Sequence, residues 1–205
     1  FVSRPGGYFA NIVSSQRRRD DTKDEDVLGR AIWALGFTAA QEYLPQDIRK
    51  EAEAMFLKAL KPLPDVKTSR AISFSLIGLY FYLKRYPKKS LCKLFEELAD
   101  RQLSYYDNFS STEWQWFENQ LTYSNSRLSE ALFYAYDLTK KKKYLKTAEA
   151  TLNFLSQITF LENHYAPIGQ NGWYFRNKQR SYFDQQPEDA ASMAETQLIA
   201  FKITK

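Results

Sequence analysis

The sequence predicts an all-α protein, and its composition and periodicity are the observations that predict it. The 205 residues include only 7 glycines and 7 prolines, too few for a turn-dense β-sandwich or a glycine-rich phosphate-binding scaffold. Apolar residues recur at helical spacing along most of the chain, and no stretch alternates with period two for more than a few residues. The hydrophobic share of 44% and the charged share of 26% are typical of a chain that folds around a core.

The boundaries of the expected helices follow from prolines and from charged first turns. Acidic residues 24–26 favour the positive end of a first helix, Pro45 opens a second, and Pro62 ends it. The seven expected helices cover approximately residues 25–41, 46–61, 69–85, 90–106, 126–139, 142–159 and 187–205. Between residues 164 and 183, several turn residues allow a short β-hairpin.

Two kinds of helix alternate along the chain. The first, third and fifth are apolar around most of their circumference, and the third carries no charge between residues 71 and 83. The second, fourth and sixth have one apolar stripe and a charged opposite face, as surface helices do. This pattern predicts hairpins arranged as an inner and an outer ring, an incomplete (α/α) toroid over residues 21–205 after an N-terminal extension, residues 1–20. An irregular α-bundle is the alternative.

Chemically unusual residues gather just before the inner helices. In a toroid of hairpins the inner helices run parallel, so their N-terminal ends open onto one face. Residues 25–30, 114–125 and 184–188 are therefore expected to meet there. The structural alternative is that the acidic residues only favour the helix dipoles and that the polar ones only cap the helices.

These three segments, with residues near them, offer carboxylates, amides and flat aromatic rings. Sugars present apolar C–H faces and many hydroxyl groups, so such side chains hold them by stacking and by hydrogen bonds. A phosphate ligand would need glycine-rich loops and converging basic residues, which are scarce here. An oligosaccharide or glycoside is therefore the expected ligand. The candidate ligand-binding residues are Arg30, Trp33, Trp114, Trp116, Tyr123, Asn125, Arg127, Trp173, Gln185 and Gln186.

Composition argues against several other classes of function. One cysteine, Cys92, and one histidine, His164, leave no disulfide framework and no cysteine-based or two-histidine metal site, and we expect no cofactor. The net charge of +5 sits in two basic runs, 17–19 and 140–143, so nucleic-acid binding is not expected. No apolar run is long enough to span a membrane. The chain begins at Phe1 with no apolar signal segment after it, so we expect that a secretory signal is absent or already removed and that the chain is a processed form or a fragment. The expected location is the cytoplasm.

A family resemblance is carried by three strings of the sequence, EDVLGRAIWALG, WQWFENQLTYSNSRL and FDQQPEDAASMAE. Over approximately residues 20–203, the chain resembles a bacterial helical-toroid domain of the six-hairpin glycosidase superfamily. Such domains often form the C-terminal part of proteins classed as glycosyltransferases. The resemblance therefore implies a toroid with its cleft at the inner-helix N-terminal ends, and a covalently linked glycosyltransferase module. The chain departs from the family by ending after a fourth inner helix, without the closing hairpins.

The resemblance favours glycoside processing, with Glu118 and Asp184 as the catalytic pair and Asp26 or Glu188 in reserve. Glu118 follows two aromatic residues, an apolar setting that suits a general acid, and Asp184 is expected to activate water. The alternative is a non-catalytic carbohydrate-binding or scaffolding module attached to a glycosyltransferase, which needs no working pair of carboxyl groups. A sugar epimerase would depend on histidines, of which there is one, and a protein-binding solenoid would lack clustered tryptophans and amides.

Overall fold

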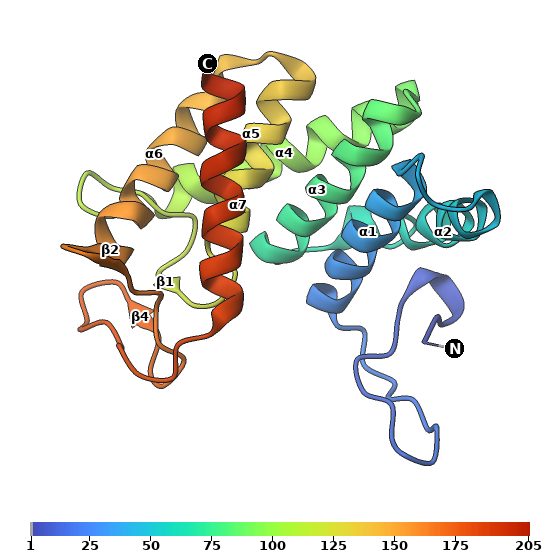
Figure 1. The fold of residues 1–205 in the computed structure, drawn as a ribbon, viewed down its shortest axis with the longest axis horizontal. Helices are drawn as coiled ribbons and strands as arrows, with labels where there is room; N and C mark the ends of the chain where they lie inside the picture. Colours follow the sequence, from blue (N-terminus) through green and yellow to red (C-terminus); the bar gives the residue numbers. More distant parts are fainter. Residues whose placement is uncertain (1) are drawn as a thin grey trace. The chain divides into compact units, whose positions relative to one another are not determined.

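The computed structural model describes residues 2–205 and confirms the all-α class (Figure 1). Within these residues the chain forms seven α-helices, whose bounds agree with the expected ones to within a few residues. The helices are α1 (Glu25–Ala40), α2 (Gln46–Ala59), α3 (Ser69–Arg85), α4 (Lys89–Phe109), α5 (Ser126–Thr139), α6 (Lys142–Thr159) and α7 (Pro187–Thr204). Among the described residues, no helix combines the length and the apolar character that crossing a membrane requires.

Four two-residue strands form two small antiparallel pairs. The strands are β1 (Gln120–Leu121), β2 (Phe160–Leu161), β3 (His164–Tyr165) and β4 (Tyr174–Phe175), and two 3-10 helices, η1 (Pro5–Gly7) and η2 (Leu63–Asp65), are also present. β1 pairs with β4, and β2 pairs with β3. The hairpin expected within residues 164–183 is not formed, because β3 and β4 each pair with a strand outside that range. The pairing of β1 with β4 instead ties the segment before α5 to the loop before α7.

The internal contacts of the chain divide it into two compact units, Phe1–Leu98 and Ala99–Lys205. α4 begins in the first unit and ends in the second. The arrangement as an incomplete toroid, and the expected bounds of an extension at 1–20 and a domain at 21–205, stay predictions.

In the first unit, α1 and α3 pack side by side with their backbones in contact. A Cβ atom added to Gly29 would lie 2.7 Å from the carbonyl oxygen of Ala71, and one added to Gly36 would lie 2.3 Å from that of Gly78. Residue numbers rise together along both helices at these contacts, so α1 and α3 run parallel. α3 is buried over residues 69–79, as expected for an inner helix.

α1 differs from α3 in being buried on one side only. Its Leu28 and Ile32 side chains are fully buried, whereas Phe37 is 38% exposed. The apolar circumference of this predicted inner helix is therefore not matched by burial on most sides in the described residues. α2 and α3 both pack against α1, and they leave part of its circumference open.

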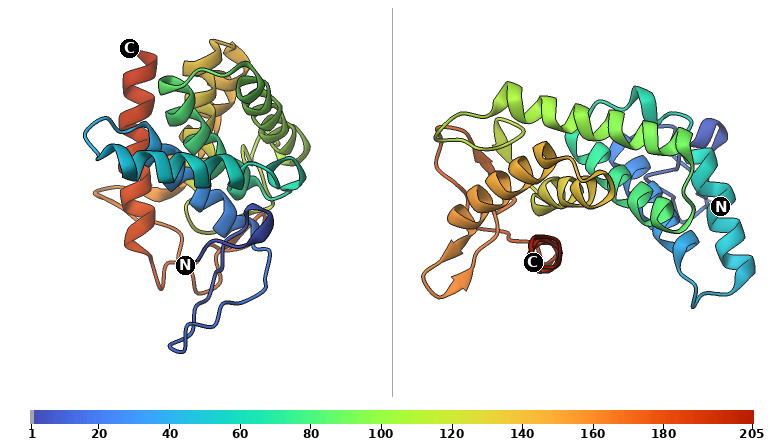
Figure 2. Two further views of the ribbon diagram at one scale, coloured as in Figure 1. Left: turned by 90° about the vertical axis from the view of Figure 1, so that its right-hand side faces the viewer. Right: turned by 90° about the horizontal axis from the view of Figure 1, so that it is seen from above.

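In the second unit, α5 is the central helix, and α6 and α7 both pack against it (Figures 1 and 2). α5 is buried over residues 126–135. α7 runs parallel to α5, because Ser124 contacts Glu188 where both helices start and Glu130 contacts Thr196 further along. Each unit thus holds a parallel pair of helices that are two apart along the chain, as expected for neighbours in an inner ring.

Candidate functional site

Two of the three predicted site segments meet in the second unit, at the N-terminal ends of α5 and α7. The Ser124 hydroxyl donates a hydrogen bond of 2.9 Å to the Glu188 carboxylate. The ring centroids of Tyr123 and Trp173 lie 6.1 Å apart. This part of the molecule is called the terminal region below, and it comprises residues 123–125, 173 and 184–188.

The first turn of α7 explains why acidic residues stand in the terminal region. Pro187 opens the helix, and Glu188 and Asp189 follow in the first turn, where the helix dipole stabilises negative charge. Asp189 is buried, and its backbone carbonyl accepts a hydrogen bond of 3.1 Å from the Tyr165 hydroxyl. Burial, together with the charges of Asp189 and Glu188, raises the pKa of Tyr165 above its ordinary value. Glu188 therefore has a structural role at the start of α7.

Three residues of the terminal region have a left-handed backbone. The φ angle is 49° at Ser124, 53° at Trp173 and 61° at Asp184. This conformation costs a non-glycine residue about 1–2 kcal/mol, and such strained positions gather at functional sites. Ser124 is buried, whereas Asp184 is exposed, so the strained turn at Asp184 presents a carboxylate to solvent.

The loop before α7 is held in place by bonds to Gln170. The backbone N–H of Gln170 donates to the Asp184 carbonyl at 3.0 Å, and its side chain accepts a hydrogen bond from the Gln186 amide. Gln185, between these two positions, is exposed. Of the predicted ligand-binding residues in this loop, Gln185 has the most open side chain and Gln186 is partly committed to the loop.

Trp114 and Trp116 belong to the core of the second unit. Trp116 is fully buried and Trp114 is 4% exposed. The Trp114 ring packs edge-on against Phe154 and Tyr174, with centroid distances of 5.2 and 5.3 Å. Its Nε1 donates a hydrogen bond of 2.7 Å to the carbonyl of Glu118, whose side chain is half-buried. Neither indole ring is accessible to a ligand, which corrects the prediction that they stack on a sugar.

Asn125 is likewise committed to the fold. Its Oδ1 accepts a hydrogen bond of 2.9 Å from the backbone N–H of Thr122, and its Nδ2 donates one of 2.7 Å to the Thr122 carbonyl. The side chain is buried, and these two bonds close the turn between β1 and α5. Asn125 therefore positions the terminal region and does not face a ligand, which corrects its predicted role.

Arg127 lies at the centre of a charge cluster between α5 and α7, in which Arg127 and Glu130 are buried and Glu195 is exposed. Its guanidinium contacts the Glu130 carboxylate at 2.5 Å and the Glu195 carboxylate at 2.7 Å. The Thr196 hydroxyl donates a further hydrogen bond of 3.2 Å to Glu130. Burial raises the pKa of Glu130 from its ordinary 4.5 to about 7, and Glu195 acts in the same direction, against the lowering effect of Arg127. The predicted ligand role of Arg127 is thus replaced by a role in joining α5 to α7.

Glu130 and Glu195 are not among the residues predicted from the sequence, although part of a signal for them is present there. Glu130 is one of few charged residues on a helix that is apolar on most sides, and a charge on a buried helix needs a partner. The spacing of Arg127 and Glu130 places them on one helix face, which identifies one partner. The other, Glu195, is 68 residues from Arg127, and no sequence pattern connects the two.

The predicted site residues of the first unit also lie close together. Asp26 and Arg30 form a salt bridge of 2.8 Å along α1. The Arg30 guanidinium lies over the Phe74 ring at 4.5 Å from its centroid, and Trp33 stacks on the same ring at a centroid distance of 5.7 Å. Asp26 is thus paired within its own helix, and Arg30 and Trp33 cover Phe74 of α3.

In residues 2–205, no group of three or more histidine, cysteine, aspartate or glutamate side chains is arranged to hold a metal ion. The all-α fold and the terminal region define a helical domain with aromatic, amide and carboxylate groups at the start of two parallel helices. The chain matches no protein-family model, no curated protein and no solved structure. Its function is therefore argued from the geometry and chemistry of the terminal region.

Proposed function

We propose that the second unit binds a carbohydrate at the terminal region. The observation that carries this proposal is the meeting of the Tyr123 and Trp173 rings, 6.1 Å apart, beside the segment that holds Asp184 and Gln185. Aromatic rings cover the C–H face of a sugar, and amide and carboxylate groups hydrogen-bond its hydroxyls. The terminal region offers all three groups within one short stretch of surface.

The charge of the terminal region favours a neutral sugar over an acidic one. Asp184 and Glu188 supply carboxylates, and no lysine or arginine belongs to the residues that define the region. A uronic acid or a phosphorylated sugar would place like charges together, which is unfavourable. The ligand class that fits is a neutral oligosaccharide or glycoside.

Carbohydrate binding without hydrolysis is the better-supported form of the proposal. Glycoside hydrolysis needs two carboxyl groups about 5–5.5 Å or about 6.5–9.5 Å apart on either side of the scissile bond. Of the reserve candidates, Asp26 is paired with Arg30, and Glu188 accepts a hydrogen bond from Ser124. Both carboxylates therefore have structural partners. The resemblance adds that such a domain can serve as a non-catalytic module attached to a glycosyltransferase.

Glycoside hydrolysis is the second candidate, and one observation favours it. Asp184 presents an exposed carboxylate from a strained backbone position, φ 61°, which is a common setting for a functional residue. Glu118 remains its proposed partner as general acid. Under this candidate, Asp184→Asn and Glu118→Gln abolish the release of product while sugar binding persists.

The test measures bound sugar and released product separately for the 205-residue chain against a panel of neutral oligosaccharides. We expect Tyr123→Ala and Trp173→Ala each to weaken binding about tenfold, or about 1.4 kcal/mol, because each removes a stacking face. Tyr43→Ala is the matched control, since this ring is 75% exposed in the first unit. Unchanged affinity in both variants, with their folding verified by circular dichroism, would contradict the proposal.

A further inference from the structure

A second part of the same unit has the chemistry of a sugar site. A cavity of about 380 Å³ lies between the segment before β1, the C-terminal half of α6, and β4. Small-molecule sites have volumes of about 300–1,000 Å³, so this cavity has room for a sugar ring. The lining residues that matter here are Glu113, Gln115, Asn153, Phe154, Gln157 and Tyr174.

The polar side chains around this cavity are not used by the fold. Glu113, Asn153 and Gln157 are exposed and Gln115 is half-buried. None of these four side chains has a hydrogen-bond or ion-pair partner among the described residues. One carboxylate and three amides are therefore available to the hydroxyl groups of a ligand.

The aromatic side of the cavity is rigidly supported. Phe154 and Tyr174 both pack edge-on against the buried Trp114, at 5.2 and 5.3 Å. Trp114 is buried in the core, whereas its neighbours Glu113 and Gln115 line the cavity. Trp114 thus acts as a support that fixes two partly exposed rings.

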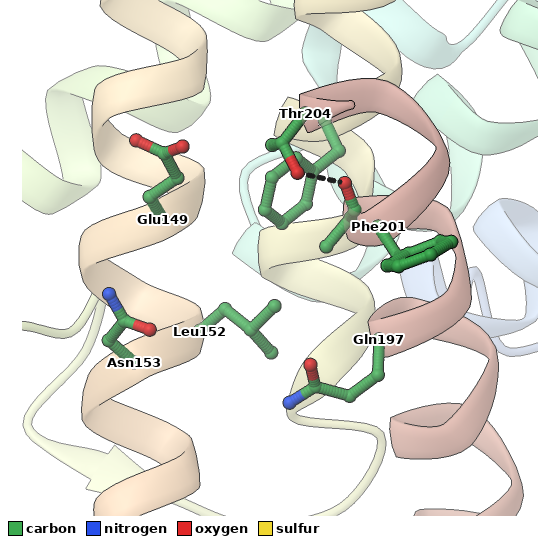
Figure 3. A pocket seen from close by; sticks show the side chains of 8 residues that line it. Glu149, Leu152, Asn153, Gln197, Phe201 and Thr204 are labelled. Carbon is green, nitrogen blue, oxygen red and sulfur yellow. Dashed lines mark hydrogen bonds between the residues drawn. The ribbon is translucent and has the colours of Figure 1, made fainter.

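A second cavity of about 380 Å³ adjoins the first at Asn153, whose side chain lines both. Figure 3 shows this second cavity between α6 and α7, with Glu149 and Asn153 on one side and Gln197 and Phe201 on the other. Leu152 forms part of its apolar floor. Because both cavities border Asn153 of α6, we refer to the pair as the α6 groove.

Among residues 2–205, no lysine, arginine or histidine lines either part of the α6 groove, whereas Glu113 and Glu149 give it negative charge. An anionic sugar would lack a basic partner there. A ligand with hydroxyl groups, apolar faces and no negative charge fits both parts of the groove.

We propose that the α6 groove is a second carbohydrate site, distinct from the terminal region, and that it binds a neutral disaccharide or longer chain across α6. This inference rests on the proposed function, because it takes carbohydrate as the ligand class. Asn153, shared by both cavities, would contact two neighbouring sugar units. Phe154 and Tyr174 would supply the stacking faces.

The experiment titrates the full 205-residue chain with maltose, cellobiose and N,N′-diacetylchitobiose, observed by NMR at the side-chain amides and at the Ile158 methyl groups. Four variants are compared with the wild type: Asn153→Ala, Gln157→Ala, the control Gln179→Ala, and the double change of Tyr123 and Trp173 to alanine. Asn153, Gln157 and Gln179 are exposed, so their substitution leaves the core intact.

Support for the α6 groove consists of shifts at the amides of Asn153 and Gln157, and about tenfold weaker binding in those two variants but not in Gln179→Ala. If a disaccharide binds and only the double variant of Tyr123 and Trp173 loses affinity, the proposal of the α6 groove is overturned. The proposed binding at the terminal region then stands. If the wild type binds none of the three disaccharides, both proposals are overturned. An affinity for a glucuronic acid disaccharide equal to that for a neutral disaccharide would also overturn the proposal of the α6 groove. The negative charge of the groove is expected to disfavour an anionic sugar.

Discussion

Replacing Glu130 with glutamine tests the charge cluster that joins α5 to α7. Glu130 is fully buried, and its Oε1 has no hydrogen-bond partner among the described residues. The amide of glutamine has nearly the same shape and still offers an oxygen to Arg127 and Thr196. The substitution therefore removes the ionisable group with little change in packing.

The sign and size of the effect follow from the pKa of Glu130. Burial raises this pKa from 4.5 to about 7, so the folded protein binds a proton that the unfolded chain releases. A raised pKa contributes stability that is fully present below pH 4.5 and is lost as the pH rises through 7. Between pH 5.5 and 8, we expect the wild type to lose about 2 kcal/mol of unfolding free energy from this group.

Urea unfolding at a series of pH values, followed by circular dichroism, measures this change. The Glu130→Gln variant is expected to show little pH dependence between pH 5.5 and 8. Glu149→Gln is the matched control, because it makes the same chemical change at an exposed position of α6 and should keep the wild-type dependence. An equal slope in wild type and Glu130→Gln would refute the reasoning, since the pH dependence would then arise elsewhere.

Two further substitutions test the backbone geometry. Gly36→Ala should lower the unfolding free energy by about 1–3 kcal/mol in urea melts, because its Cβ would lie 2.3 Å from the Gly78 carbonyl oxygen; a neutral or stabilising effect would mean that α1 and α3 are not in backbone contact. Asp184→Gly should raise the unfolding free energy by up to about 1 kcal/mol, because glycine adopts a φ of 61° without strain. A decrease of about 1 kcal/mol, which is the usual effect of introducing glycine at a position with helical φ and ψ angles, would show that the backbone at Asp184 is not left-handed.

The helices could be predicted from the sequence because their signals are local. Prolines, charged first turns and the 3.6-residue period depend on neighbouring residues only, and they located all seven helices in the described chain. The alternation of apolar and amphipathic helices also identified α3 and α5 as buried. α1 was misjudged, because an apolar composition does not reveal how many neighbours a helix has.

The candidate site was predicted only in part, for reasons of the same kind. The sequence placed Tyr123 and Glu188 at the starts of parallel helices, and these residues do lie in one region. The sequence pattern does not show which side chains of residues 113–117 point into the core. Trp114 and Trp116 were therefore predicted to contact the ligand, whereas both are buried. Pairing of two-residue strands depends on distant partners and leaves almost no pattern in the sequence.

The polar character of the contact between α5 and α7 has a consequence for the alignment of these helices. Two helices that meet only through apolar side chains can shift by one turn along each other at a small cost in free energy, because one apolar side chain takes the place of another. Here a slide of one turn would separate Glu195 of α7 from Arg127 and leave the buried guanidinium with Glu130, on its own helix, as its one remaining carboxylate partner in this cluster. The charge cluster thus favours a single axial register of α7 against α5. In that register, the first turns of the two helices lie side by side.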